Sequence, residues 1–166
     1  MSKIQILPNL CTAANLLLGV AALAAVMNQN FQLSVVLILL AAAFDRLDGI
    51  LARRYNAASS FGKEFDSLSD LVSFGVAPAS LLYRSLGWHL HIASLACFAL
   101  FILCGAFRLA RFNILNDPSH FLGVPITVAG SILAVAIFFI PNPIFIVALA
   151  VLLSLAMIST IRIPKI

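Results

Sequence analysis

The residues most suited to chemistry are four aspartates that lie close together in an otherwise apolar sequence. The chain of 166 residues has only six acidic residues, and five of them fall between positions 45 and 70. Asp45 and Asp48 are close enough in sequence to project from one face of a helix, and so are Asp66 and Asp70. Only a short loop, residues 54–62, separates the two predicted helices. We therefore expect antiparallel neighbours whose four carboxylates converge.

Four converging carboxylates in an apolar chain need a counter-charge. An ionised carboxylate within a membrane span costs about 2.5 to 3.5 kcal/mol on insertion scales, and the four also repel one another. Ion pairs with Arg46, Arg53, Arg54 and Lys63 are one alternative, but several of these bases lie on other helix faces or in the loop. Oxygen ligands without His or Cys favour hard cations such as Mg²⁺, Mn²⁺ or Ca²⁺. Two such ions would clamp a diphosphate and stabilise in-line displacement at phosphorus.

The elements that must position these side chains are long apolar segments. Hydrophobic residues make up 63% of the chain and charged residues 10%, with a mean hydropathy of +1.11, whereas soluble domains average about 45–50% and about 25%. Lipid favours helices because it cannot satisfy open backbone groups, and each span needs about 20 apolar residues. We expect a single-domain, all-α integral membrane protein that begins with an interfacial segment at residues 1–9. Six transmembrane helices are predicted near residues 10–26, 31–53, 63–83, 91–112, 121–140 and 144–161.

Basic residues lie mainly at alternate ends of the predicted spans. They are Lys3, the group Arg53, Arg54 and Lys63, the pair Arg108 and Arg111, and the pair Arg162 and Lys165. The turns near residues 28–30 and 141–143 carry none. This positive-inside pattern predicts that both termini and the aspartates face the cytoplasm at the cell membrane. Anionic lipid headgroups, rather than nucleic acid, are then the expected partners of the net charge of +4.

The full spacing of the aspartate region resembles a known signature. The region reads Asp45-x-x-Asp48-Gly49-x-x-Ala52-Arg53, then eight residues, then Gly62-x-x-x-Asp66-x-x-x-Asp70. This pattern resembles the signature of the CDP-alcohol phosphotransferase family. The resemblance implies a six-helix membrane fold, a homodimer, and a site for two divalent ions, Mg²⁺ or Mn²⁺. It also implies transfer of a phosphatidyl or similar group from a CDP-linked lipid to an alcohol, with release of CMP.

The resemblance assigns roles to individual residues. Asp45, Asp48 and Asp66 would be the principal metal ligands, and Asp70 would be a ligand of the second metal and the general base. The residues expected to contact the CDP group are Asp48, Gly49, Ala52, Arg53 and Gly62. The stretch from Pro8 to Asn15 resembles the family's first-helix element, which adds Asn9, Thr12 and Asn15 to the nucleotide pocket. For these three, helix capping and interhelical hydrogen bonds are an equally open interpretation.

Further stretches bear on the acceptor alcohol. Three of them resemble the membrane-type phosphatidylserine synthases, which implies L-serine as the acceptor: residues 68–78, 104–113 and 121–126. Arg108 and Arg111 lie near the cytoplasmic end of the fourth span and are predicted to bind the serine carboxylate or a substrate phosphate, since a guanidinium suits both. Ser69 and Ser73 are placed to help hold serine. Ordinary flanking charge for the arginines and helix packing for the serines are the alternatives.

Other functions stay open at this point. A cation transporter also places carboxylates in membrane spans, but it favours repeated halves, and the sequence has no internal repeat. A membrane prenyltransferase also binds Mg²⁺–diphosphate, although its two aspartate motifs usually lie far apart in a longer chain. Within the resembled family, the acceptor is alternatively glycerol 3-phosphate or an inositol phosphate. The aspartate pattern does not distinguish CDP-diacylglycerol from the ether lipid CDP-archaeol, because both donors present the same CDP head.

Overall fold

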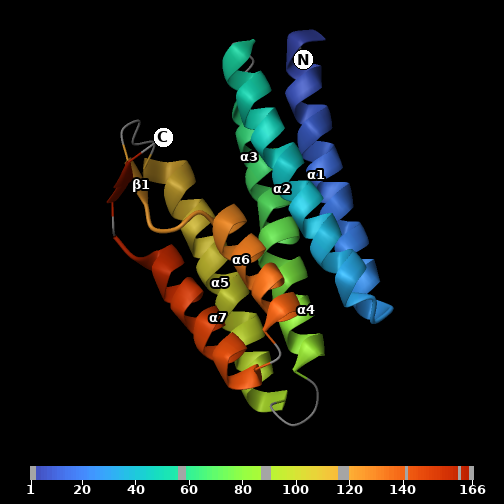
Figure 1. Cartoon of the computed structure of the whole chain (residues 1–166). Coiled ribbons are helices and arrows are strands. Elements are labelled where there is room, and N and C mark those ends of the chain that lie inside the picture. Colours follow the sequence, from blue (N-terminus) through green and yellow to red (C-terminus); the bar gives the residue numbers. More distant parts are fainter. Residues whose placement is uncertain are drawn as a thin grey trace.

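Helices make up almost all of the computed structural model, which describes residues 3–55, 59–86, 91–115, 120–140, 142–160 and 162–164. The helices are α1 (Lys3–Met27), α2 (Phe31–Arg54), α3 (Ser60–Asp70), the π-helix η1 (Leu71–Val76), α4 (Ala77–Ser85), α5 (His91–Leu115), α6 (Ile126–Phe139) and α7 (Pro143–Ile158). Because α3, η1 and α4 follow one another without a break, the described helices form six rods (Figure 1). The predicted all-α fold of about six helices is confirmed. A short antiparallel pair of three-residue strands, β1 (His120–Leu122) and β2 (Arg162–Pro164), is an addition to it.

The first and fifth predicted spans differ from the observed helices at their starts. α1 begins at Lys3 and continues through Pro8, so residues 3–9, predicted as an interfacial segment, belong to the same helix as the first span. Proline is tolerated inside membrane helices because neighbouring groups satisfy the backbone that it frees. α6 begins only at Ile126, because residues 120–122 form β1 and pair with β2, and Gly123 (φ 75°) and the extended Pro125 follow before the helix.

Polar side chains begin three of the helices. Asn30 and Asn142 accept hydrogen bonds from main-chain amides in the first turns of α2 and α7, and Ser59 does the same for α3. Such N-caps satisfy amides that have no partner inside the helix. Asn30 and Asn142 belong to the polar breaks predicted between neighbouring spans, where the chain reverses direction.

The helices that carry the aspartates meet at one end of the molecule. The start of α1, the end of α2 and the start of α3 lie together there (Figure 1). α1 packs against α2, α3, η1 and α4, whereas α5 packs against α4, η1 and α7. α6 lies between these groups, in contact with α2, α4, η1 and α7. This packing brings the end of α2 and the start of α3 against α1.

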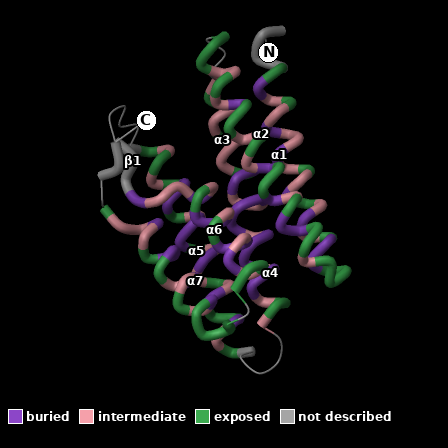
Figure 2. The backbone as a smooth tube through the Cα atoms, in the orientation of Figure 1, coloured by how far each residue is buried: buried purple, intermediate pink, exposed green. Residues whose placement is uncertain are grey.

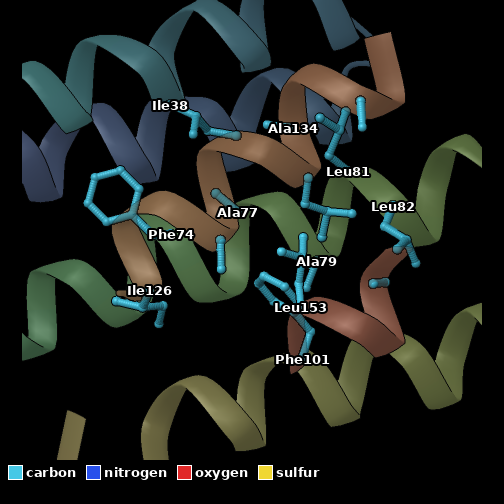
Figure 3. Close-up of a cluster of buried hydrophobic side chains, with 14 of the residues drawn as sticks. Ile38, Phe74, Ala77, Ala79, Leu81, Leu82, Phe101, Ile126, Ala134 and Leu153 are labelled. Carbon is cyan, nitrogen blue, oxygen red and sulfur yellow. The ribbon is translucent and has the colours of Figure 1, made fainter. Parts of the chain in front are cut away.

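The apolar core lies mainly between η1, α4, α5, α6 and α7. Phe74 of η1, Leu81 of α4 and Phe101 of α5 are fully buried, and they lie with Ile126 of α6 and Leu153 of α7 (Figure 3). Buried residues follow the inner faces of the helices and exposed residues the outer faces (Figure 2). One core therefore holds η1 and the helices around it together.

Large apolar side chains also cover the outside of the molecule. Leu17, Phe139 and Ile144 are 69%, 71% and 75% exposed, and an apolar outer surface of this kind marks contact with lipid or with another protein. Two segments, Leu7–Met27 of α1 and Ile92–Ile114 of α5, are long and apolar enough to cross a membrane, with mean hydropathies of 2.1 and 2.2. α6 and α7 are shorter apolar helices.

The π-helix η1 is held by close approach of neighbouring helices. A side chain on Gly130 of α6 would collide with the main chain of Phe74, and one on Gly19 of α1 would collide with Ser73. Small residues allow such close contact between helix backbones. Single π-turns are rare and occur frequently at functional sites. Here η1 begins directly after Asp70, the last of the four aspartates.

Candidate active site

Three of the four predicted carboxylates form a tight group. Asp45 and Asp48 of α2 and Asp66 of α3 each offer a carboxylate oxygen, and these oxygens lie within 4.8 Å of one another. Asp45 and Asp48 share one face of α2. α3 runs antiparallel to α2 as predicted, but each of the two helices packs mainly against α1 and not against the other. Asp48 is only 6% exposed. The fold therefore gathers acidic side chains from two helices into one partly enclosed position.

Asp70 completes this group from the last position of α3. Its side chain is buried, and its carboxyl group lies beside those of Asp45 and Asp66. The Asn15 side chain in α1 donates a hydrogen bond from Nδ2 to Asp70 Oδ1 at 3.2 Å. All four aspartates thus meet where α1, α2 and α3 join.

Two threonine hydroxyls orient the aspartates of α2. Thr12 in α1 donates to Asp48 Oδ2 at 2.8 Å, and Thr127 in the first turn of α6 donates to Asp45 Oδ2 at 3.3 Å. Each bond leaves further lone pairs on the carboxylate for a cation. Sequence reasoning singled out Thr12 but missed Thr127, because a lone threonine far along the chain has no spacing that links it to the aspartates.

The group of carboxylates fits a hard divalent cation. All of its donors are oxygens, which Mg²⁺, Mn²⁺ and Ca²⁺ prefer. Asp66 Oδ1 is buried and has no hydrogen-bond partner among the described residues. A buried acceptor without a partner is unfavourable, and adjacent carboxylates repel one another strongly away from water. A cation between them removes both unfavourable effects.

A cavity of about 190 Å³ opens beside the carboxylates. Its wall residues are Pro8, Asn9, Thr12, Asp48, Gly49, Ala52, Ser59, Gly62, Lys63 and Asp66. A methyl group on Gly49 would meet nothing within 4 Å, so the wall formed by α2 is open there. Asn9 Nδ2 is buried and has no acceptor within the described part of the chain. An open wall and an unpaired donor are properties expected of a ligand site.

Most residues predicted to contact the CDP group line this cavity. Those that do are Asn9, Thr12, Asp48, Gly49, Ala52 and Gly62. Arg53 is exposed near the end of α2, and Asn15 is fully buried beside Asp70, so neither is a wall residue. The nucleotide roles of these residues stay predictions.

Lys63 is a wall residue that sequence reasoning considered as a counter-ion for the aspartates and as a flanking charge, but not as a ligand of the nucleotide. Its Nζ donates to the main-chain oxygen of Asn113 at 3.0 Å, which links α3 to the end of α5. An ammonium group beside an open cavity is suited to a phosphate. The available signal was its place directly after Gly62 in the aspartate pattern.

Among the residues predicted to bind the acceptor, Arg108 lies close to the aspartates. It is 6% exposed and interacts electrostatically with Asp70 and Asp45. Its Nε is buried without a hydrogen-bond partner among the residues that the structure describes, and its Cζ lies 5.8 Å from the centre of the Phe112 ring. A buried guanidinium with an unused N–H donor is suited to an anionic group.

The other three predicted acceptor residues make contacts within the helical scaffold. Arg111 donates from both terminal nitrogens to main-chain oxygens at the end of α7, at 2.9 and 3.0 Å. Ser69 donates to a carbonyl oxygen of its own helix at 2.8 Å, and Ser73 donates to the Asn15 carbonyl oxygen at 3.0 Å. These bonds account for a structural role, and a role in binding serine stays a prediction for all three.

Comparison with known proteins agrees with this geometry. The sequence profile of the CDP-alcohol phosphatidyltransferase family matches residues 5–161. The chain belongs to this family. The resemblance first seen in the aspartate pattern is thereby confirmed for almost the whole length of the chain.

Several relatives of this CDP-alcohol phosphatidyltransferase are named for serine transfer. The CDP-diacylglycerol–serine O-phosphatidyltransferase of Helicobacter pylori is 35% identical over 99% of this chain and 74% of its own length. The protein of the same name from Methanocaldococcus jannaschii is 44% identical over 98% of this chain and 76% of its own length. The archaetidylserine synthase of Methanothermobacter thermautotrophicus is 34% identical over 96% of this chain and 70% of its own length.

Family membership also supports two general conclusions, one about the membrane and one about the metal. The two long apolar helices, in a family of membrane-bound synthases, make this phosphatidyltransferase a membrane protein. The family uses divalent metals, and the carboxylates of Asp45, Asp48 and Asp66 form a group suited to them.

Proposed function

We propose that this phosphatidyltransferase transfers the phosphatidyl group of CDP-diacylglycerol to the hydroxyl of L-serine, forming phosphatidylserine and releasing CMP. The observation that carries the proposal is the group of three carboxylates, Asp45, Asp48 and Asp66, beside an open cavity. Relatives named for the same serine transfer support the acceptor. The relative named as an archaetidylserine synthase makes CDP-archaeol the alternative donor.

The four aspartates would hold two divalent ions, Mg²⁺ or Mn²⁺. Asp45, Asp48 and Asp66 would supply the principal ligands, and Asp70 would contact the second ion. Ions of this kind, when bound, neutralise a diphosphate and make its phosphorus more susceptible to attack. The hydrogen bond from Thr12 to Asp48 supports this role, because it holds the carboxylate in one orientation.

The cavity walls would hold the CDP group. Asn9 Nδ2 offers an unpaired donor, Lys63 brings positive charge to the phosphates, and Gly49 lets the nucleotide approach the helix backbone. The lipid chains of the donor would stay in the bilayer beside the apolar outer surface. A substrate with a charged head and a lipid tail therefore suits this position at one end of the bundle.

Asp70 would act as the general base for serine. The serine hydroxyl oxygen attacks the phosphorus that carries the diacylglycerol. The new O–P bond forms as the bond from this phosphorus to the bridging diphosphate oxygen breaks, and CMP leaves with that oxygen. Asp70 accepts the hydroxyl proton as the O–P bond forms, since the hydroxyl becomes acidic only at that stage.

Arg108 is the residue that we propose for the serine carboxylate. Its guanidinium is buried near Asp70 and has an unpaired Nε donor among the described residues. A guanidinium binds carboxylates with well-defined geometry. Serine would then be held at two points, with its carboxylate at Arg108 and its hydroxyl at Asp70.

We also propose that the chain crosses the cell membrane six times, with both termini and the aspartates on the cytoplasmic side. The positive-inside distribution of Lys3, Arg53, Arg54 and Lys63 supports this orientation. The exposed apolar side chains would contact lipid and, in a homodimer, a second copy of the chain.

An acceptor series tests the proposed function. Purified protein receives Mn²⁺ or Mg²⁺, CDP-diacylglycerol and one of L-serine, glycerol 3-phosphate or an inositol phosphate, and CMP release is measured. We expect release with serine, and phosphatidylserine as the lipid product by mass spectrometry. Release only with another acceptor contradicts serine as the substrate, and no release with any acceptor contradicts the transferase activity. CDP-archaeol in a parallel series compares the donors.

A further inference from the structure

The polar residues on one face of α1 have distinct contacts. Asn15 is fully buried, and its Nδ2 donates to Asp70 Oδ1 at 3.2 Å. Thr12, about one turn earlier on the same face, makes the corresponding bond to Asp48. Asn9, a further turn toward the start of the helix, lines the cavity. Along α1, Asn9 therefore lines the cavity, whereas Thr12 and Asn15 donate hydrogen bonds to aspartates.

The position of Asn15 itself is fixed by η1. The Ser73 hydroxyl donates to the Asn15 carbonyl oxygen at 3.0 Å. Gly19, one turn further along α1, lies so close to Ser73 that any side chain there would collide with it. Because η1 directly follows Asp70, α1 contacts this part of the chain both at Asp70 and about one turn later. The two contacts hold Asp70 at a defined place relative to α1.

We propose that Asn15 is a positioning residue for Asp70 and lies outside the nucleotide pocket. Within the described chain, Asn15 Oδ1 has no hydrogen-bond partner, so the bond to Asp70 is the contact that the structure gives this side chain. An amide N–H donates without taking up a proton, so it orients the carboxylate without competing for the substrate proton. This bond fixes the orientation of the Asp70 carboxyl group, which also lies beside Asp45 and Asp66. This inference rests on the proposed function, because it gives Asn15 a role in that proton transfer.

Two matched substitutions test this assignment. Asn15→Leu removes the donor while keeping a side chain of similar size, and Asn9→Leu makes the same change at the cavity wall. We expect Asn15→Leu to lower kcat about 10- to 100-fold, the loss typical of a hydrogen bond to a charged group. The KM and the dissociation constant for CDP-diacylglycerol should stay within about twofold, because only the transition state is affected. Asn9→Leu should instead raise both of these constants.

Several outcomes would overturn the positioning role. An Asn15→Leu variant with a raised KM and an unchanged kcat would place Asn15 in the nucleotide pocket. Asn15→Ala, which opens space instead of filling it, repeats the test if the leucine variant does not fold. Failure of both variants to fold, or an unchanged kcat per folded molecule, would assign Asn15 to the packing of the bundle.

The same assay separates this inference from the proposed function. Absence of serine transfer by the wild-type protein would contradict the proposed function. The role of Asn15 is judged only from the ratio of variant to wild-type kcat, with whichever acceptor the wild-type protein uses.

Discussion

Replacing Gly49 with alanine should stabilise α2 and at the same time weaken the binding of the CDP-lipid donor. Gly49 lies in the interior of α2, and a methyl group there meets no atom within 4 Å. Alanine is about 1 kcal/mol more favourable than glycine inside a helix, which corresponds to about 2–4 °C in the thermal midpoint of a chain of this size. The same methyl group would enter the space assigned to the CDP group. Overpacking of this kind costs about 1–3 kcal/mol, or about a 5- to 150-fold rise in KM for CDP-diacylglycerol.

The assay for Gly49→Ala combines two measurements on one preparation. The thermal midpoint is followed by circular dichroism in detergent, and KM is obtained from CMP release at saturating serine. Ser34→Ala is the matched control, because Ser34 is buried in the same helix but lies near its other end. It should leave KM unchanged. A Gly49→Ala variant with a raised midpoint and a wild-type KM would refute the assignment of this cavity to the nucleotide.

Other substitutions and removal of metal give further tests. Gly130→Ala places a methyl group against the main chain of Phe74, so its thermal midpoint should fall by about 2–12 °C; an unchanged midpoint would contradict the tight packing around η1. Arg108→Lys should raise the KM for serine about tenfold through loss of the guanidinium geometry. Arg111 was also predicted to bind serine, but both of its terminal nitrogens donate to the end of α7, so Arg111→Lys should lower the midpoint and leave that KM unchanged; equal effects of the two variants on KM would argue against this division. Dialysis against a chelator should abolish CMP release and added Mn²⁺ or Mg²⁺ should restore it; activity that persists without metal would exclude the proposed metal site.

The carboxylate group could be predicted because its geometry is local. Two helical spacings and one short loop predict that Asp45, Asp48 and Asp66 converge, and the structure places one oxygen of each within 4.8 Å of the others. Both helices pack against α1, which completes the arrangement. Long apolar segments likewise determine the helical rods, since helices satisfy the backbone within a single segment. The cavity beside Gly49 also follows from the same short stretch of sequence, together with the first turns of α1.

The contacts that connect distant helices could not be predicted in this way. Thr127 of α6 donates a hydrogen bond to Asp45, and Arg111 of α5 donates two to main-chain oxygens at the end of α7. No sequence spacing links the donors to these acceptors. η1 packs closely against Gly19 and Gly130, which lie on two other helices. Packing between helices therefore determines the orientation of the Asp70 side chain. The helical spacing of Asp66 and Asp70 alone predicts that both lie on the same face of their helix.

Transfer of labelled serine into lipid, by the wild-type protein and by Asp70→Asn, tests most directly whether the aspartate group carries out this reaction. Asparagine has nearly the same shape as aspartate but cannot accept the hydroxyl proton. We predict labelled phosphatidylserine from the wild-type protein and none above background from Asp70→Asn, with CDP-diacylglycerol still bound by the variant. Labelled phosphatidylserine formed by Asp70→Asn at the wild-type rate would contradict this account.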